Sequence, residues 1–501
     1  MSQPSEICVS VGRTRNSAMR EQHETLARDG ASLVELRLDY LKATPDIPGL
    51  LRDRPTPVVM TCRRKVDRGR FRGDESERIG LLKQAILGGA DYVDLEGDIA
   101  KTVRRFKGTK RIISYHNFLE TPENLDEIHT ELAGLDADYV KMATTACTPA
   151  DAVRMLELVR RKSAAGMPTI GFCMEECGVF SRVLCGKYGS PLTYATFSEE
   201  RVLAPGQLTY HEMRDRYHYE SINEKTAVFA VVGDPIVQSY SPHIHNAALR
   251  SAGLNAVYVP ILVPSDAFEA SMKALEPLRM GGFSVTIPHK KAAAEFAGYR
   301  DATVEEAGVA NTLYRDDKLH WHATNTDLPA ALGTLRDAIG ENASLAGRHV
   351  LLLGAGGVAT AIAMGLMKAG AQLTITNRNK GRGKELAARL GCAFKPWESR
   401  STVRCDVLVN GTPIGMFPDT EETPFPGNWL QDGMTVFDTI YNPENTLLIK
   451  QARERGCRIA SGLEMFVRQA ADQFQAFTRQ PAPVKVMRQT LRQAINPVTL
   501  N

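Results

Sequence analysis

The sequence predicts an α/β protein in which a (β/α)8 barrel precedes a two-domain unit with a Rossmann fold. Between residues 6 and 210, eight short β-branched segments alternate with helical patterns, as a barrel of parallel strands requires. A glycine-rich turn at 354–359 follows one strand pattern and opens a helix pattern, which is typical of the Rossmann fold. The length of 501 residues also exceeds one compact core and favours about three domains.

The composition is that of an ordinary soluble globular protein. The 61 basic and 58 acidic residues leave a net charge of +3, so we expect neither nucleic acid nor a membrane as partner. The first residues lack the apolar core of a signal peptide, and no run is long enough to span a membrane. We therefore expect a cytoplasmic protein, in keeping with nine scattered cysteines. Cys173, Cys177 and Cys185 lack metal-site spacing, so we expect no metal.

The eight predicted barrel strands share short runs of β-branched and apolar residues. They are 7–11, 33–38, 57–62, 92–95, 111–115, 139–143, 169–172 and 192–195. Apolar residues at helical spacing, as in 151–165, fill most of the intervals between them. This alternation predicts a barrel domain over residues 1–222.

Polar side chains occur near the carboxyl ends of these strands, where barrel enzymes place their active sites. Glu35 and Arg37 lie in the second strand, Arg63 follows the third, and His116 follows the fifth. Lys141 lies inside the sixth strand, where a buried ammonium is costly unless it is paired. On one interpretation Lys141 has a structural role only, and either points outward or pairs with a carboxylate such as Glu35. On the other interpretation it is a desolvated lysine that forms a Schiff base with a ketone.

Four motifs around Lys141 resemble the type I 3-dehydroquinate dehydratases over nearly the whole first half. They are Glu35-Leu-Arg-Leu-Asp39, Ser114-Tyr-His-Asn-Phe118, Ser181-Arg-Val-Leu184 with Tyr188-Gly189, and Ala204-Pro-Gly-Gln207. The resemblance implies that Lys141 forms an imine with the substrate ketone. It also implies that His116 is the general base and acid, and that Arg182 binds the carboxylate. The positions that it implies for hydroxyl binding and charge are Glu35, Arg37, Arg63 and Gln207.

Two residues depart from that family's pattern. Asp67 stands where the family usually has a glutamate that orients the histidine, and Leu203 replaces a serine. The lost serine hydroxyl removes a hydrogen bond worth about 1 kcal/mol. We therefore expect a working dehydratase, whose rate or affinity Leu203 can lower.

A polar segment at 211–226 separates the barrel from the next strand pattern at 227–232. Either a last barrel helix or a connector fits it. The second half is predicted to hold a substrate domain at 226–328, completed by 462–495, and a Rossmann domain at 329–461. A C-terminal helix at about 462–478 should fold back onto the substrate domain, followed by a tail with one short helix.

The glycine-rich turn predicts a dinucleotide site, because it connects strand 349–353 to helix 358–368. The turn residues are Gly354, Ala355, Gly356, Gly357, Val358 and Ala359. The next strand, 372–376, ends without the acidic residue that binds the ribose of NAD. In its place come Asn377, Arg378, Lys380 and Arg382. Basic side chains favour a 2′-phosphate and hence NADP(H), although a merely solvated basic turn has the same pattern.

Five further motifs, together with the glycine-rich turn at 354–359, resemble the shikimate dehydrogenase family over the C-terminal half. They are Val232-Gly-Asp-Pro-Ile-Val-Gln-Ser-Tyr-Ser-Pro-His-Ile-His245, Ser284-Val-Thr-Ile-Pro-His-Lys-Lys291, Asn311-Thr312, Asn325-Thr326-Asp327 and Asn410-Gly-Thr-Pro-Ile-Gly-Met416. The resemblance implies that Lys290 and Asp327 form the catalytic pair, without showing which of them transfers the proton. The implied substrate ligands are Ser239, Ser241, Thr286, Asn311, Tyr441 and Gln469. Thr412 and Gly462 are implied at the cofactor.

Two departures occur here as well. Ser284 replaces an asparagine, and Leu328 replaces a glycine, which can reshape the hinge between the two domains. Neither departure removes a reacting group.

The two halves thus resemble consecutive enzymes of aromatic amino-acid biosynthesis, in the order known from plant fusions. We expect small-molecule substrates: 3-dehydroquinate, 3-dehydroshikimate and shikimate. An NAD-dependent quinate dehydrogenase is a second interpretation, which a cofactor comparison would test. A non-catalytic sensor is a third interpretation, disfavoured because Lys141, His116, Lys290 and Asp327 are all present.

Overall fold

The computed structural model describes residues 5–106, 108–198, 206–340 and 344–496. The chain divides into two compact units, one of residues 1–239 with 255–280 and one of residues 240–254 with 281–501. No helix in the described ranges is long and apolar enough to cross a membrane. Leu203 lies outside the described residues.

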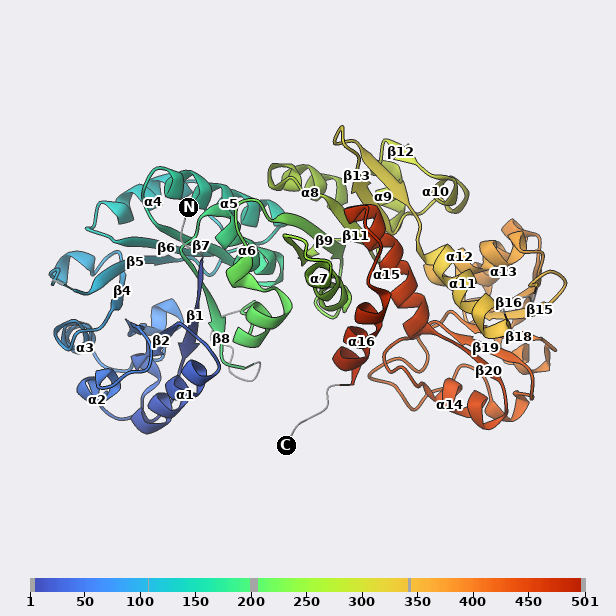
Figure 1. Cartoon of the computed structure of the whole chain (residues 1–501), viewed down its shortest axis with the longest axis horizontal. Coiled ribbons are helices and arrows are strands. Elements are labelled where there is room, and N and C mark those ends of the chain that lie inside the picture. The colour runs from blue at the N-terminus through green and yellow to red at the C-terminus, as the bar shows by residue number, and fades with distance from the viewer. Residues whose placement is uncertain (1–4, 107, 199–205, 341–343, 497–501) are drawn as a thin grey trace. The chain divides into compact units, whose positions relative to one another are not determined.

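The first unit contains the predicted eight-stranded parallel barrel, which confirms that part of the fold class (Figure 1). Its strands are β1 (Glu6–Val11), β2 (Leu33–Arg37), β3 (Val58–Thr61), β4 (Tyr92–Glu96), β5 (Lys110–His116), β6 (Tyr139–Thr145), β7 (Thr169–Met174) and β8 (Leu192–Thr196). They pair in the order β7-β6-β5-β4-β3-β2-β1-β8, so the sheet is nearly closed. The surrounding helices are α1 (Asn16–Arg28), α2 (Ile47–Leu51), α3 (Glu75–Leu87), α4 (Leu125–Ala133), α5 (Pro149–Ala164) and α6 (Val179–Leu184).

Packed side chains fill the barrel interior, as expected for eight strands. Cys8, Val59, Ile112, Ile170 and Leu192 belong to one buried cluster there. Side chains alternate along each strand, so every second residue points into the barrel. The inward residues nearer the carboxyl ends of the strands are polar and form the next layer beyond this apolar one. The apolar layer supports the base of the site.

The segment after the barrel is neither a regular helix nor an exposed connector. It forms one π-helical turn at Glu212–Arg216 and a 3-10 turn at Tyr219–Ser221. Tyr210, Met213 and Tyr219 are buried, and the Tyr219 hydroxyl lies 2.6 Å from Ser5 Oγ. Its apolar residues lack regular spacing, which is why the sequence pattern did not show their burial. The first unit ends with the parallel pair β9 (Ala227–Gly233) and β10 (Ala256–Leu262), together with α8 (Phe268–Leu275).

The second unit begins with short elements that hold the predicted substrate side of the reductase. They are α7 (Ser241–Ser251), β11 (Gly282–Val285), α9 (Lys290–Phe296), β12 (Tyr299–Arg300), α10 (Ala302–Ala307), β13 (Thr312–Arg315) and β14 (Trp321–Thr324). Strand β13 pairs antiparallel with both β11 and β14, whereas β12 pairs parallel with β14.

A six-stranded parallel sheet in the order β17-β16-β15-β18-β19-β20 confirms the predicted Rossmann fold. Its strands are β15 (His349–Leu353), β16 (Gln372–Asn377), β17 (Ala393–Pro396), β18 (Val407–Asn410), β19 (Thr435–Asp438) and β20 (Arg458–Ser461). Its helices are α11 (Asp327–Ile339), α12 (Gly357–Lys368), α13 (Lys380–Leu390) and α14 (Leu447–Glu454). The strand order reverses between β15 and β18, which is where ligands bind in such sheets.

Two C-terminal helices follow the last strand, α15 (Gly462–Thr478) and α16 (Val484–Ile495). The predicted helix at 462–478 is confirmed in its bounds. Helix α15 contacts α11, α7 and β13, and α16 packs on α7 and α15 (Figure 1). The chain therefore returns from the Rossmann sheet to the elements near the start of the second unit.

Two candidate active sites

A pocket opens at the carboxyl ends of the barrel strands, and it collects the residues predicted for the first reaction. All eight of them line it: Glu35, Arg37, Arg63, Asp67, His116, Lys141, Arg182 and Gln207. They come from positions between residues 35 and 207, so the barrel brings them together only when its strands close. A site of this kind is the usual arrangement in barrel enzymes.

Lys141 points into the pocket and is 4 % exposed. Its Nζ lies 3.0 Å from Asp94 Oδ2 and 3.8 Å from the centre of the Tyr194 ring. The outward interpretation of Lys141 is therefore wrong, and so is Glu35 as its partner. Glu35 instead accepts hydrogen bonds from Ser10 Oγ (2.6 Å) and Thr61 Oγ1 (2.8 Å).

Asp94 is the main residue of this site that the sequence did not reveal. It is buried on β4, and its second oxygen lies 2.9 Å from Arg63 Nη2. Burial by itself would raise the pKa of Asp94, but Arg63 and Lys141 outweigh it and hold the pKa below its ordinary value. The carboxylate is ionised and shared by two cations. An aspartate inside the apolar run Tyr92-Val-Asp-Leu95 was the available signal.

Arg63 is held by a second buried carboxylate. Its Nη1 lies 2.7 Å from Glu96 Oε1, and Arg78 Nη1 lies 2.8 Å from Glu96 Oε2. Arg78 reaches this point from α3, which begins at Glu75 in a capping box with Asp74 as its cap. Arg78 is fully buried, so the charge chain extends from Lys141 to the outer helix layer.

His116 lies at the end of β5 and stacks against Phe118, with ring centres 6.0 Å apart. Burial lowers the pKa of His116 well below its ordinary value, and the cations Arg63 and Lys141 lower it further. The imidazole is therefore neutral at neutral pH, which is the form that accepts a proton.

Asp67 lines the pocket without binding His116. Its carboxylate accepts a hydrogen bond from Arg64 Nε at 2.5 Å. The shorter aspartate at this position is thus directed to a neighbouring arginine, and no contact joins it to the histidine among the described residues. The expected orienting role of this position has no counterpart in the structure.

Arg182 lines the same pocket as Lys141 and comes from the short helix α6. Its guanidinium stacks on Phe172 at 4.4 Å, and Phe172 packs against Tyr194. Burial lowers the pKa of Arg182 to about 10, so the side chain stays charged at neutral pH. The Tyr194 hydroxyl is buried and has no hydrogen-bond partner in the described part of the chain. The rings of Tyr194 and Phe172 therefore lie between the two cations.

The second site lies in the second unit and is centred on Lys290 and Asp327. Lys290 opens α9 and Asp327 opens α11, and Nζ lies 2.6 Å from Oδ2. Asn325 fixes the start of α11, because its Oδ1 accepts from Asp327 N at 3.1 Å. The backbone of Lys290 is also bound to the segment just before Asn311, because Ala310 N donates to Lys290 O at 2.8 Å.

Asn311 is anchored beside this pair. Its Oδ1 accepts from Thr326 N (2.8 Å) and its Nδ2 donates to Thr326 Oγ1 (3.0 Å). Gln473 on α15 donates to Asn311 O at 3.1 Å and accepts from Ser284 Oγ at 2.7 Å. Ser284, the departure from the family pattern, therefore bonds α15, and Gln473 was not identified from the sequence. Thr286 lies between Ser284 and Lys290 in the chain.

Tyr441 and Gln469 lie on neighbouring elements of the same unit. The Tyr441 ring is 4.5 Å from Phe466 and 6.1 Å from Tyr240, which directly precedes Ser241 at the start of α7. Gln469 Nε2 donates to Phe466 O at 3.0 Å. Ser239 is the last residue of the first unit before α7.

The departure at Leu328 has a packing consequence. A Cβ built on Gly365 of α12 would lie 2.5 Å from Leu328 Cδ1. Leu328 therefore packs directly on α12 and holds the start of α11 against that helix.

The glycine-rich turn has the shape of a phosphate cradle. Gly354 has φ +114°, and a Cβ there would lie 2.8 Å from Gly411 O. At Gly356 and Gly357, in contrast, a Cβ would meet no atom within 4 Å, so the N-terminus of α12 is open. Turn backbone and helix end fit a pyrophosphate. Thr412 lies next to this turn and bonds Asn410 Oδ1 through both its N (3.0 Å) and Oγ1 (2.7 Å).

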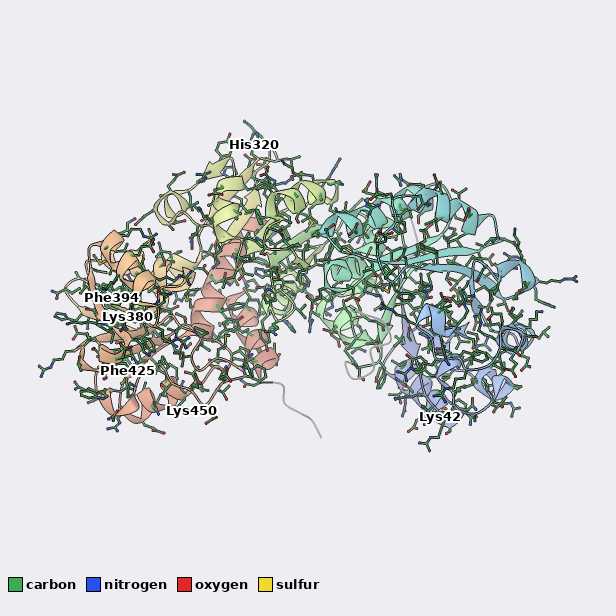
Figure 2. The ribbon with its side chains drawn as sticks, turned by 180° about the vertical axis from the view of Figure 1, so that it is seen from behind. Lys42, His320, Lys380, Phe394, Phe425 and Lys450 are labelled. Atoms are coloured by element: carbon green, nitrogen blue, oxygen red, sulfur yellow. The ribbon has the colours of Figure 1, made fainter. Side chains whose placement is uncertain are left out.

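The basic residues after β16 are available to a further phosphate. Arg378, Lys380 and Arg382 are exposed, and Figure 2 labels Lys380. Asn377 ends β16 and donates to Asn379 O at 2.9 Å. Lys380 lies 3.7 Å from Glu398, and the other two cations have no ion pair within the described ranges. This group suits an anionic ribose substituent.

Family comparisons agree with these two sites. The model for type I 3-dehydroquinase matches residues 7–224, and the shikimate dehydrogenase substrate binding domain matches 231–313. The shikimate/quinate 5-dehydrogenase model matches 337–411, and the shikimate 5′-dehydrogenase C-terminal domain matches 462–492.

Relatives cover either the whole chain or its second half. A bifunctional 3-dehydroquinate dehydratase/shikimate dehydrogenase from Arabidopsis thaliana, described as chloroplastic, is 37% identical over 96% of this chain and 83% of its own. A shikimate dehydrogenase (NADP(+)) from Moorella thermoacetica is 36% identical over 55% of this chain and 95% of its own. A crystal structure of shikimate dehydrogenase in complex with NADP+ matches with 31% identity and a TM-score of 0.51, over 55% of this chain and 98% of its own.

A barrel that buries a lysine among charged groups, followed by a Rossmann unit with a Lys–Asp pair, defines a two-part enzyme with a lyase-type and a reductase-type site. The chain belongs to the family of bifunctional 3-dehydroquinate dehydratase/shikimate dehydrogenases.

Proposed function

We propose that this chain converts 3-dehydroquinate to 3-dehydroshikimate in its barrel and reduces that product to shikimate in its second half. The observation that carries the proposal is that one chain holds two separate lysine–aspartate pairs, Lys141–Asp94 and Lys290–Asp327. The bifunctional relative, which aligns with 96% of this chain, supports the same two activities in this order.

In the barrel, the Lys141 ammonium first loses a proton to solvent, and the amine then attacks the C3 ketone and water leaves, which gives an imine. Neutral His116 then removes a proton from C2, and the C–H electron pair moves into the imine, which becomes an enamine. The imidazolium returns a proton to the C1 hydroxyl, which departs as water. Hydrolysis of the imine releases 3-dehydroshikimate and restores Lys141, so the net change is the loss of one water.

The other pocket residues bind the substrate in this proposal. Arg182 pairs with the carboxylate, for which a guanidinium fork is well suited. The substrate hydroxyls are bound, and the charge around the imine is set, by Arg37, Glu35, Arg63 and Gln207. Asp67 lines the same pocket.

In the second half, Lys290 and Asp327 supply the proton that the C3 oxygen needs when the ketone becomes an alcohol. Asp327 keeps Lys290 in place through the 2.6 Å contact. Ser239 and Ser241 bind the carboxylate, whereas Thr286, Asn311, Tyr441 and Gln469 bind ring hydroxyls. NADP(H), when bound, supplies the hydride.

The cofactor is NADP(H), bound by the glycine turn and the basic residues after β16. The turn residues 354–359 hold the pyrophosphate, and Asn377, Arg378, Lys380 and Arg382 hold the 2′-phosphate. Thr412 follows β18 and lies next to this cradle, and Gly462, the first residue of α15, is assigned to the cofactor as well. The functional division is then 1–222 for the dehydratase, 226–328 with 462–495 for the reductase substrate domain, and 329–461 for the cofactor domain.

Two assays test these assignments separately. Borohydride reduction in the presence of 3-dehydroshikimate should attach the substrate to Lys141, which peptide mass mapping detects. A missing label would contradict the imine. A comparison of NADPH with NADH should give a much higher reductase kcat/KM for NADPH, whereas a preference for NADH or quinate would support the quinate dehydrogenase alternative. We also propose a reducing compartment, the cytoplasm, because all nine cysteines are free.

A further inference from the structure

A buried carboxylate outside the reacting pair lies between two loops of the Rossmann domain. Asp438 ends β19 and is fully buried. It has no Lys, Arg or His partner in the described part of the chain. A buried carboxylate is costly unless hydrogen bonds satisfy it, so the surrounding donors matter.

Three donors from three different segments surround Asp438. Its Oδ1 accepts from Asn410 Nδ2 at 3.0 Å and from Ile440 N at 3.1 Å. Its Oδ2 accepts from Thr446 Oγ1 at 2.7 Å. The carboxylate therefore joins the end of β18, the loop after β19 and the start of α14.

Asn410 transmits this contact to the cofactor side. An amide has a donor end and an acceptor end, so the bond to Asp438 turns Asn410 Oδ1 toward Thr412. That oxygen accepts from Thr412 N and Oγ1, at 3.0 and 2.7 Å. The loop 410–412 in turn adjoins the glycine turn, because Gly411 N donates to Leu353 O at 2.8 Å.

Ile440 transmits the contact to the substrate side. The next residue is Tyr441, whose ring packs between Phe466 and Tyr240. A second tether joins the two loops, because Thr439 Oγ1 donates to Asn410 O at 2.8 Å.

We propose that Asp438 is a positioning residue of the reductase, which holds the cofactor loop 410–412 and the substrate loop 440–442 in one fixed relation. The inference rests on the proposed reductase function. Asp438 acts through Asn410 and Ile440 and touches neither reactant. Burial raises the pKa of Asp438 to about 6, so its charge is kept at an energetic cost, as is common at functional sites.

The test compares Asp438→Leu with Asp438→Asn. The leucine removes both acceptor oxygens, and so all three hydrogen bonds, at similar volume, and we expect the KM for NADPH and the KM for 3-dehydroshikimate both to rise, by about tenfold. The asparagine can present its oxygen to Asn410 and Ile440 and its amide to Thr446, so it should restore most of both KM values. Dehydratase activity in the same samples should stay unchanged.

Thr446→Val is the matched control, because it removes the bond from Asp438 to α14 and the helix cap on Ile449 N, but leaves the bonds of Asp438 to Asn410 and Ile440. It should leave both KM values as in the wild type. The proposal is overturned if Asp438→Leu leaves both KM values unchanged, or if Thr446→Val raises them equally. A wild-type chain without any reductase activity would instead contradict the proposed function.

Folding of the variants can be followed in the same unit. All three tryptophans, Trp321, Trp397 and Trp429, belong to the second unit, so their emission reports on the reductase half. If Asp438→Leu fails to fold, Thr439→Val is the second variant, since it removes the hydroxyl bond to Asn410 O, keeps the backbone bond from Thr439 N at 3.1 Å and leaves the carboxylate in place. It should raise both KM values by a smaller factor, and unchanged values would overturn the proposal.

Discussion

Lys141 owes its chemistry to its neighbours on other strands. Asp94 binds its ammonium and the Tyr194 ring covers it, while Arg63 competes for the same carboxylate. A lysine with such partners can be held in one orientation without exposure to water. Its side chain therefore stays inside the pocket that Arg182 also lines.

Replacing Lys141 by arginine should separate charge from nucleophilicity. Lys141→Arg keeps a cation for Asp94 but cannot form an imine, so we expect dehydratase kcat to fall by at least about 10³-fold. Reductase activity should be unchanged. Lys42→Arg, at an exposed lysine labelled in Figure 2, is the control. Residual dehydratase activity near the wild-type level would contradict the imine mechanism.

The pH dependence of the dehydratase tests His116. Because its pKa is lowered, the imidazole remains neutral as pH falls through 6.5, the ordinary pKa. We expect no loss of kcat/KM from this group until well below that pH. A half-maximal rate at or above pH 6.5, matched by a titration of the His116 imidazole at the same pH in NMR spectra, would contradict the assignment.

The same shift has a consequence for stability. A histidine with a lowered folded pKa contributes stability that is present above its ordinary pKa and is lost as pH falls below it. The barrel should therefore unfold more readily as pH falls below about 6.5, and His116→Asn should reduce this part of the pH dependence. Thermal unfolding of both chains across this range measures it.

At the scale of elements, the glycine turn is set by backbone geometry as much as by the cofactor. Gly354→Ala would have to adopt φ +114° with its Cβ against Gly411 O, at a cost of about 1–3 kcal/mol. We expect a lower unfolding midpoint in tryptophan emission and a higher KM for NADPH, with dehydratase activity unchanged.

Gly391→Ala is the matched control for the glycine turn. Gly391 also has a positive φ, of 66°, but nothing lies within 4 Å of its Cβ position. Its replacement should cost some stability without affecting the KM for NADPH. If both variants bind NADPH as the wild type does, the turn does not hold the cofactor.

Asp438 gives the second unit a pH-dependent stability of its own. A carboxyl group whose folded pKa is raised contributes stability below its ordinary pKa of 3.8, which is lost as pH rises through about 6. The loss reaches about 3 kcal/mol at neutral pH. The free energy of unfolding of Asp438→Asn minus that of the wild type should therefore increase between pH 4 and 7, because only the wild type loses stability over this range. A difference independent of pH would contradict the raised pKa.

Elements were easier to predict from the sequence than contacts between them. Strand and helix periods depend on neighbouring residues, so β1–β8, β15 and α15 were found close to their bounds. The partners of Lys141 and Asn311 were not found, because Asp94 and Gln473 come from distant segments that only the closed fold places there. Asp67 shows the converse: its position in the chain matched a motif, but its carboxylate binds Arg64.

At the scale of the whole molecule, each reaction has its own compact unit for its central residues. The barrel pocket lies within the first unit, and Lys290 and Asp327 lie within the second. Variants in one site should therefore leave the other activity intact, which makes each activity an internal control for the other.

The central claim, that both reactions occur on this chain, is tested by one coupled assay. Purified protein is mixed with 3-dehydroquinate and NADPH, with no other enzyme, and the absorbance of NADPH is followed. We expect it to fall with the wild type, and to stay constant with Lys141→Arg until 3-dehydroshikimate is added. Constant absorbance with the wild type, followed by a fall on adding 3-dehydroshikimate, would contradict the dehydratase. No fall with either substrate would contradict the reductase.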